Sequence, residues 1–315
     1  MTRPGISARW RLAADLALLA VTAVWGSTFV LVKGAVARYP VLPFLAVRFA
    51  VAAVALLPVT LAHRPAVRRS DLLAGVLAGG LLFAGYGFQT AGLQHTEAAK
   101  AGFITGLSVV LVPLFVAVLW RRLPSWQALA GTVLATVGLG MLSLGADWSI
   151  GRGDLLVLGC AFSFAGHITA LGALAPGRDP RLLTLIQVST VSVLSGALVL
   201  ARGAFPAMPG PVWGAAIFTG VAATAMAFLV QTAAQQFTTA GHTALIFAAE
   251  PVFAALFGVL VAGERMLARG WAGCGLILAG VILGALAQVA ESAPPAAAAT
   301  EGANAVRRHL REEAR

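Results

Sequence analysis

Residues 89–98 read QTAGLQHTEA, and residues 231–240 read QTAAQQFTTA. Six of the ten positions are identical when Gln89 is laid over Gln231, an offset of 142, and two Gln and two Thr are among them. Alanine matches carry little information in an alanine-rich chain, but shared Gln and Thr in apolar surroundings carry more. The same offset pairs two glycines with two others, Gly131 with Gly273 and Gly138 with Gly280. The chain therefore contains an internal repeat.

The composition around this repeat is that of a membrane protein. Of the 315 residues, 59% are hydrophobic and 11% are charged, whereas soluble domains carry about 25% charged residues. Apolar runs of the length that crosses a bilayer, about 20 residues, recur along the chain. They predict ten spans: Leu12–Val32, Val41–Leu61, Leu72–Leu93, Ala98–Leu119, Ala128–Leu144, Leu155–Ala175, Leu182–Leu200, Val212–Ala234, Ala240–Val261 and Gly270–Ala290. A soluble enzyme and a secreted disulfide scaffold are excluded.

The repeat contains five of these spans, and five is an odd number. The second copy must therefore enter the membrane from the opposite side, which makes the repeat an inverted one. We expect an all-α membrane protein with ten transmembrane helices in two inverted five-helix repeats. The expected units are an N-terminus (1–12), two repeats (13–146 and 151–288) and a flexible tail (291–315).

The distribution of basic residues predicts the orientation, because Lys and Arg are enriched in cytoplasmic segments. With the N-terminus inside, 14 basic residues lie on the cytoplasmic side and 7 on the outer side. Both termini are therefore expected in the cytoplasm of a cell whose inner membrane holds the chain. The net charge of +10 is spread singly and in short groups, so we expect no nucleic-acid partner.

Glu250 is the ionisable residue with the strongest functional indication. It lies within an apolar run, where an acid costs about 2.5 kcal/mol or more to insert. Pro251 follows it and cannot donate to the carbonyl of Phe247. We expect a helix break at Pro251, and a second one at Pro113 in the corresponding span of the first repeat. Glu250 is either a coupling or substrate-binding carboxylate, or a structural acid that bonds to nearby backbone or to a buried base.

Other polar residues share helix faces at spacings of three, four or seven. They are Trp25 with Thr28, Tyr86 with Gln89, Cys160 with Ser163 and His167, and Thr224 with Gln231, while His242 begins the ninth span. Singly, such residues usually join membrane helices by hydrogen bonds. Together they predict a polar, aromatic-lined cavity. Arg48 lies about two turns into its span and is expected to reach outward to the interface or to pair with an acid.

No sequence pattern indicates a cofactor or a metal. There is no Gly-rich phosphate loop and no metal-spaced His pair, and Cys160 and Cys274 are expected to be packing residues. The expected partners are a small-molecule substrate and the lipid bilayer. The leading hypothesis is a secondary transporter that works by alternating access. Two alternatives stay open. One is a scaffold or sensor derived from a transporter. The other is an intramembrane enzyme, which is less favoured because the sequence lacks the clustered His or Asp that its catalysis would need.

Three segments resemble a known family. Residues 25–29 read WGSTF, residues 249–255 read AEPVFAA, and residues 263–265 read GER. Over about residues 13–288 the chain resembles the EamA-type members of the drug/metabolite transporter superfamily. The resemblance implies a ten-helix inner-membrane permease, commonly one for efflux of amino acids or other small metabolites. The hypothesis that transport is coupled to protons rests on Glu250 and not on the resemblance.

The first repeat departs from the family pattern at two positions. Arg122 stands where the family commonly has Glu, and it is the repeat mate of Glu264. Val109 is the repeat mate of Pro251. These departures argue against a charge network shared by the two family acids.

Overall fold

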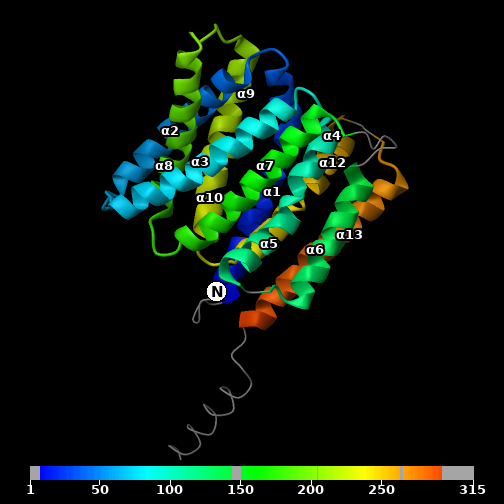
Figure 1. The fold of residues 1–315 in the computed structure, drawn as a ribbon. Coiled ribbons are helices and arrows are strands. Elements are labelled where there is room, and N and C mark those ends of the chain that lie inside the picture. The colour runs from blue at the N-terminus through cyan, green and yellow to red at the C-terminus, as the bar shows by residue number, and fades with distance from the viewer. Residues whose placement is uncertain (1–7, 122, 144–149, 204, 263–264, 293–315) are drawn as a thin grey trace, which may run out of the picture.

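A computed structural model describes residues 8–121, 123–143, 150–203, 205–262 and 265–292. The described residues form one bundle of helices (Figure 1). In chain order the elements are α1 (Ala8–Val36), α2 (Val41–Ala62), α3 (Arg69–Gly92), α4 (Ala98–Gly106), α5 (Ser108–Trp120), α6 (Trp126–Ser143), α7 (Arg152–Leu174), α8 (Pro180–Ala201), α9 (Gly210–Gly220), the π-helix η1 (Val221–Met226), α10 (Ala227–Ala234), α11 (Ala240–Phe247), α12 (Glu250–Ala262) and α13 (Ala268–Ser292).

These elements correspond to the ten predicted spans. In the part of the chain that the structure describes, nine helical segments are long and apolar enough to cross a bilayer, and Trp126–Leu142 is a shorter apolar helix. The prediction of an all-α membrane protein with ten transmembrane helices is confirmed. Leu144, the last residue of the fifth predicted span, lies outside the described residues, as do most of the predicted tail and residues 1–7 of the N-terminus.

Three of the ten spans are interrupted. The fourth consists of α4 and α5, the eighth of α9, η1 and α10, and the ninth of α11 and α12. The fourth is interrupted at Leu107 and the ninth at Ala248 and Ala249. Leu107 and Ala249 are repeat mates at the offset that lays Gln89 over Gln231, so the two breaks occupy matching positions in the two repeats.

The predicted break at Pro113 is wrong. Pro113 lies inside α5 and is buried, and the interruption is at Leu107, earlier in the same span. A proline removes one backbone donor, but a membrane helix tolerates the loss where neighbouring helices pack against it. Pro251, in contrast, is the second residue of α12, where a helix does not need the missing N–H.

The repeats are related by two offsets. α2 begins at Val41 and α8 at Pro180, and their last residues are Ala62 and Ala201, so this pair matches at an offset of 139. The fourth spans begin at Ala98 and Ala240 and match at an offset of 142. The last residues of α1 and α7, Val36 and Leu174, are 138 apart, within one residue of the same offset. The first two helices of each repeat therefore match at about 139 and the last three at about 142. The difference is absorbed between the second and third helix of each repeat.

The crossing of α6 and α13 marks the axis between the repeats. A Cβ on Gly138 would lie 2.5 Å from the carbonyl oxygen of Gly273, and a Cβ on Gly131 would lie 2.8 Å from that of Gly280. Exchanging each glycine for its repeat mate turns the Gly138–Gly273 contact into the Gly280–Gly131 contact. The helices run antiparallel and touch backbone to backbone, as expected where small residues allow close approach.

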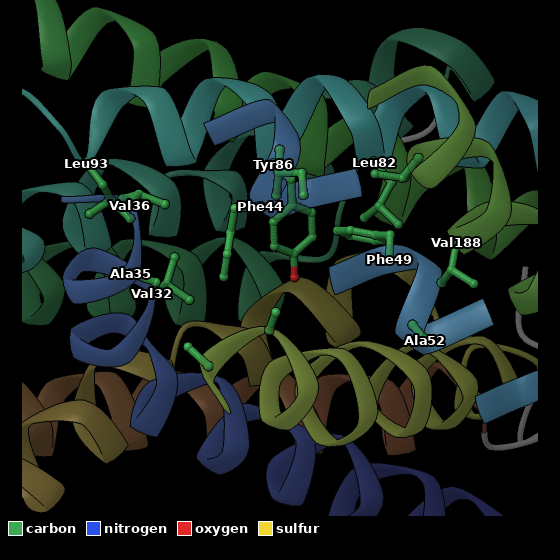
Figure 2. Close-up of a cluster of buried hydrophobic side chains, with 14 of the residues drawn as sticks. Val32, Ala35, Val36, Phe44, Phe49, Ala52, Leu82, Tyr86, Leu93 and Val188 are labelled. Carbon is green, nitrogen blue, oxygen red and sulfur yellow. The ribbon is translucent and has the colours of Figure 1, made fainter. Parts of the chain in front are cut away.

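The polarity of the bundle is that of a protein in lipid. Val30, Val118 and Leu260 are 80%, 78% and 79% exposed, because their partner in a bilayer is lipid. Polar side chains such as Thr219 and Gln187 are fully buried. An interior apolar cluster also exists, and Figure 2 shows Phe49 beside Tyr86 within it; their ring centroids are 5.1 Å apart. This cluster positions Tyr86 at the edge of the cavity described next.

Candidate functional site

A cavity lies at the centre of the bundle, with residues of both repeats in its wall. The volume open to the centres of water molecules is about 90 Å³. The wall is formed by Trp25, Thr28, Phe29, Val32, Arg48, Tyr86, Gln89, Leu93, Gly102, Thr105, Gly106, Ser108, Phe164, His167, Ile168, Phe228, Gln231, Phe247, Glu250 and Pro251. Of the polar residues predicted to form a cavity or to couple transport, seven line this one space, with Pro251 beside them: Trp25, Thr28, Tyr86, Gln89, His167, Gln231 and Glu250. Cys160 and Thr224 shared faces with these residues but are not part of the wall.

The two helix breaks bring polar groups to the cavity. Ser108 begins α5 and Glu250 begins α12, and the two residues are repeat mates at the offset of 142. Glu250 is half-buried, and its carboxylate forms no hydrogen bond or ion pair among the described residues. A carboxylate in the first turn of a helix is stabilised by the helix dipole. The first repeat has an uncharged hydroxyl at the same place.

Arg48 also lines the cavity, and both expectations for it are wrong. Its side chain is 2% exposed, so it does not reach the interface, and it makes no ion pair within 4.0 Å among the described residues. Instead Nε donates to Oγ1 of Thr224 (2.9 Å) and Nη2 to the hydroxyl of Tyr86 (3.4 Å). The guanidinium carbon lies 4.8 Å from the Tyr86 ring centroid, a distance at which cation–π attraction operates.

The π-helix η1 explains why Thr224 can serve Arg48. Thr224 donates its hydroxyl to the carbonyl of Thr219, five residues earlier (2.8 Å), which fits the wider π turn. Its oxygen can then accept from Arg48. In the same segment the carbonyl of Ala223 accepts from Nε1 of Trp25 (2.8 Å). Such π segments often occur at functional sites.

Aromatic rings from five spans surround these polar groups. The Trp25 ring lies 5.4 Å from that of Phe228 and 5.0 Å from that of Phe247. The Tyr86 ring lies 5.3 Å from that of Phe164 and 6.1 Å from that of Phe228. All four pairs are tilted or edge-to-face, and edge-to-face packing is a favoured geometry for aromatic rings. The cavity is therefore amphipathic, with a guanidinium and a carboxylate set among rings.

Three amide or imidazole groups complete the wall. Nε2 of Gln89 donates to Oγ1 of Thr105 (3.3 Å). Nε2 of Gln231 donates to Oε1 of Gln235 (3.1 Å), while Oε1 of Gln231 is buried without a hydrogen-bond partner among the described residues. His167 and Gln187 share a hydrogen bond between Nε2 and Oε1 (2.8 Å).

Two predicted site residues lie outside the cavity wall. Ser163 donates to the carbonyl of Gly159 in its own helix (2.8 Å). His242 is buried near the start of α11, with Nε2 at 3.1 Å from Oδ1 of Asp15. Neither residue is among those that line the cavity. Of the departures from the family pattern, Arg122 and Glu264 lie outside the described residues.

Among the described residues, no three or more His, Cys, Asp or Glu side chains converge in a way that could hold a metal ion. The arrangement offers hydrogen bonds, two opposite charges and aromatic faces to a solute. Residues 12–144 and 151–285 each match the EamA-like transporter family. The chain belongs to the EamA-like transporter family.

Two curated relatives of this EamA-like transporter cover most of the chain. An "Uncharacterized transporter" of Archaeoglobus fulgidus is 33% identical over 273 residues, which are 87% of this chain and 86% of the relative. The "Uncharacterized transporter YoaV" of Bacillus subtilis is 25% identical over 287 residues, 85% and 95% of the two chains. A solved structure titled "Crystal structure of protein" matches with a TM-score of 0.74 at 19% identity, over 89% of this chain and 99% of that one. That last likeness shows the fold alone.

The transporter is thus a multi-pass membrane protein that moves a small molecule. Arg48 and Ser108 are two polar cavity residues that the sequence analysis did not assign to the cavity. Signals for both existed: Arg48 is a lone charge in an apolar run, and Ser108 is the repeat mate of Glu250. Phe228 could have been found in the same way, because it is the repeat mate of Tyr86.

Proposed function

We propose that this EamA-like transporter exports a small zwitterionic metabolite, such as an amino acid, across the inner membrane by alternating access. Glu250 couples the export to protons, and both termini lie in the cytoplasm. The observation that carries the proposal is the Glu250 carboxylate, which faces the cavity at a helix break and has no protein partner among the described residues.

The size of the cavity supports a small solute. A water needs about 10–15 Å³ of such space, so 90 Å³ corresponds to about six to nine waters. A solute with a similar number of non-hydrogen atoms fits. Amino acids with small side chains have this size, whereas lipids and peptides are larger.

The charges of the cavity support a zwitterion. Arg48 carries a buried positive charge whose protein contacts are hydroxyls and rings, and Glu250 carries a carboxylate. The two do not form an ion pair with each other, so each is available to an opposite charge on a solute. A carboxylate group would pair with Arg48 and an ammonium group with Glu250, and the rings would contact the apolar part.

The repeat supports alternating access. The two halves meet at the α6–α13 crossing, and their fourth spans break at matching positions. Exchange of the two repeat conformations would move the opening of the cavity from one membrane face to the other. Protonation of Glu250 would remove its charge and thereby change the affinity for a cationic group during this cycle.

The test uses purified protein in liposomes, a pH gradient and a mixture of radiolabelled amino acids. Glu250→Gln removes the charge at nearly constant shape, so we expect it to fold with normal or higher thermal stability. Its proton-driven flux should fall to the level of empty liposomes, while exchange between equal pools survives. The matched control is Glu97→Gln, at the exposed start of α4 and outside the cavity wall, which should retain full flux.

The alternatives predict other results. A structural acid at 250 would give a less stable Glu250→Gln protein with near-normal proton-driven flux, and that outcome would overturn the coupling role. A scaffold or sensor would give no flux of any amino acid in the wild-type protein.

A further inference from the structure

Asp15 and His242 form an acid–base pair outside the cavity. Asp15 lies near the beginning of α1 and His242 near the beginning of α11, with 3.1 Å between Oδ1 and Nε2. The His242 side chain is 3% exposed. Apart from this ion-pair contact, neither ring nitrogen has a hydrogen-bond partner among the described residues. The mechanism above makes no use of this buried imidazole.

A second acid–base pair joins Asp154 and Lys100. Asp154 lies near the beginning of α7 and Lys100 near the beginning of α4, with 2.7 Å between Oδ2 and Nζ. Asp154 also accepts from the hydroxyl of Thr96 (2.6 Å) and the backbone N–H of Gly151 (2.8 Å). This carboxylate is therefore held by three donors.

The two pairs are related by the repeat. Asp15 and Asp154 match at the offset of 139, the one that relates the first two helices of the repeats. Lys100 and His242 match at the offset of 142, the one that relates the fourth spans. In each case the first helix of one repeat is joined to the fourth span of the other. An acid–base pair at the same place in both repeats follows from the repeat architecture and is not an isolated surface contact.

The pairs flank the cavity at opposite ends of the bundle. Along α1, Asp15 precedes the cavity residue Trp25 by ten residues, or about 15 Å. Along α7, Asp154 precedes the cavity residue Phe164 by the same distance. Because the repeats are inverted, α1 and α7 begin at opposite ends. Figure 1 shows the beginning of α1 at the lower end of the bundle and α4 near the upper end.

From this placement we propose that the two pairs are the closing contacts of the two access routes, and that His242 makes closure of the Asp15 end dependent on protons. The proposal rests on the proposed alternating access and adds a gate to it. An imidazolium at this place would attract Asp15 and hold that end closed, whereas a neutral imidazole would not, and the end would open more often. The Asp154 end has an ammonium group in place of the imidazole, so we expect no such response there.

Among the groups on the helices that surround His242, Asp15 is the one with which a charged imidazole would pair. α11 packs against α1, α5, α6, α7 and α13. α5 and α6 carry no titratable residue, and α11 carries only His242. The titratable or charged groups with described side chains on the other three helices are Arg9, Arg11, Asp15 and Lys33 on α1, Arg152, Asp154, Cys160 and His167 on α7, and Arg269 and Cys274 on α13. Of these, Asp15 lies within ion-pair distance of the imidazole.

The test measures opening by maleimide labelling of single cysteines in a protein that lacks Cys160 and Cys274. Leu18→Cys reports on the Asp15 end, and Val157→Cys, its repeat mate, reports on the Asp154 end; both native side chains are fully buried. Labelling rates are compared at the same pH between two proteins, which cancels the ionisation of the thiol. We compare the labelling rate of Leu18→Cys in the protein with His242 and in the His242→Lys variant. The two rates should be about equal at about pH 5.5, and the rate with His242 should be about ten times higher at about pH 8.5.

The reciprocal variant is the matched control. Lys100→His should give the Asp154 end the same pH dependence, with Val157→Cys labelled about tenfold faster than in the Lys100 protein at about pH 8.5 and equally at about pH 5.5. Asp15→Asn keeps the shape of the pair and removes its charge, so Leu18→Cys should label quickly at both pH values. This variant decides the question if His242→Lys does not fold.

A ratio that does not change with pH, or an Asp15→Asn protein that labels as slowly as its parent, would overturn the gate. Labelling needs no substrate. A failure of the gate is therefore distinct from a failure of the proposed transport, which would show as absent flux in the wild-type protein.

Discussion

The close crossing of α6 and α13 makes a sharp prediction for Gly273→Ala. The added Cβ would lie 2.5 Å from the carbonyl oxygen of Gly138 and 2.9 Å from the backbone nitrogen of Leu142. Ordinary contact begins at 3.4 Å. Both obstacles are backbone atoms, so no side chain can rotate away, and the helices must separate by about 0.9 Å along the shorter contact, a backbone shift of the kind that overpacking forces. Overpacking of this kind costs about 1–3 kcal/mol.

The matched control is Gly275→Ala in the same helix, where an added Cβ meets nothing within 4 Å. Both substitutions gain the same intrinsic helix preference of about 1 kcal/mol, which cancels when the two variants are compared. At about 2 °C for each kcal/mol, Gly273→Ala should melt about 2–6 °C below Gly275→Ala in detergent, as followed by tryptophan fluorescence. Melting points within about 1 °C of each other would refute the backbone contact.

Two further predictions concern orientation and the cavity. Single cysteines at Ala66 and Gly151, both exposed, in a protein without Cys160 and Cys274 should differ in intact cells: Ala66→Cys is protected from an impermeant reagent and Gly151→Cys reacts. The opposite labelling would reverse the proposed orientation. Arg48→Lys keeps the charge but loses the Nε donor to Thr224 and the planar stack on Tyr86, so the KM for amino-acid flux should rise about tenfold or more with the coupling ratio unchanged. An unchanged KM would remove Arg48 from substrate binding.

Several features of the fold and the site could be predicted from the sequence because each rests on local chemistry. A bilayer requires long apolar runs and penalises charge, so the ten spans and the exceptional Glu250 were visible without coordinates. A proline removes one backbone donor, and Pro251 therefore predicted the break before α12. The shared Gln and Thr predicted the repeat, and the odd number of spans predicted its inversion.

The tertiary structure decided which faces of these helices contact one another. Lipid-facing and core-facing sides of a membrane helix are both apolar, so a polar pair such as Ser163 with His167 shows a shared face but not its neighbour. Packing turned His167 toward the cavity and Ser163 onto its own backbone, and it gave Arg48 hydroxyl and ring partners in place of an acid. The offset of 139 in the first two helices was invisible to a comparison at 142, because those helices share little beyond apolar composition. Only the assembled bundle could therefore relate Asp15 and His242 to Asp154 and Lys100, since ion pairs between distant segments depend on which helices touch and not on the sequence of either helix.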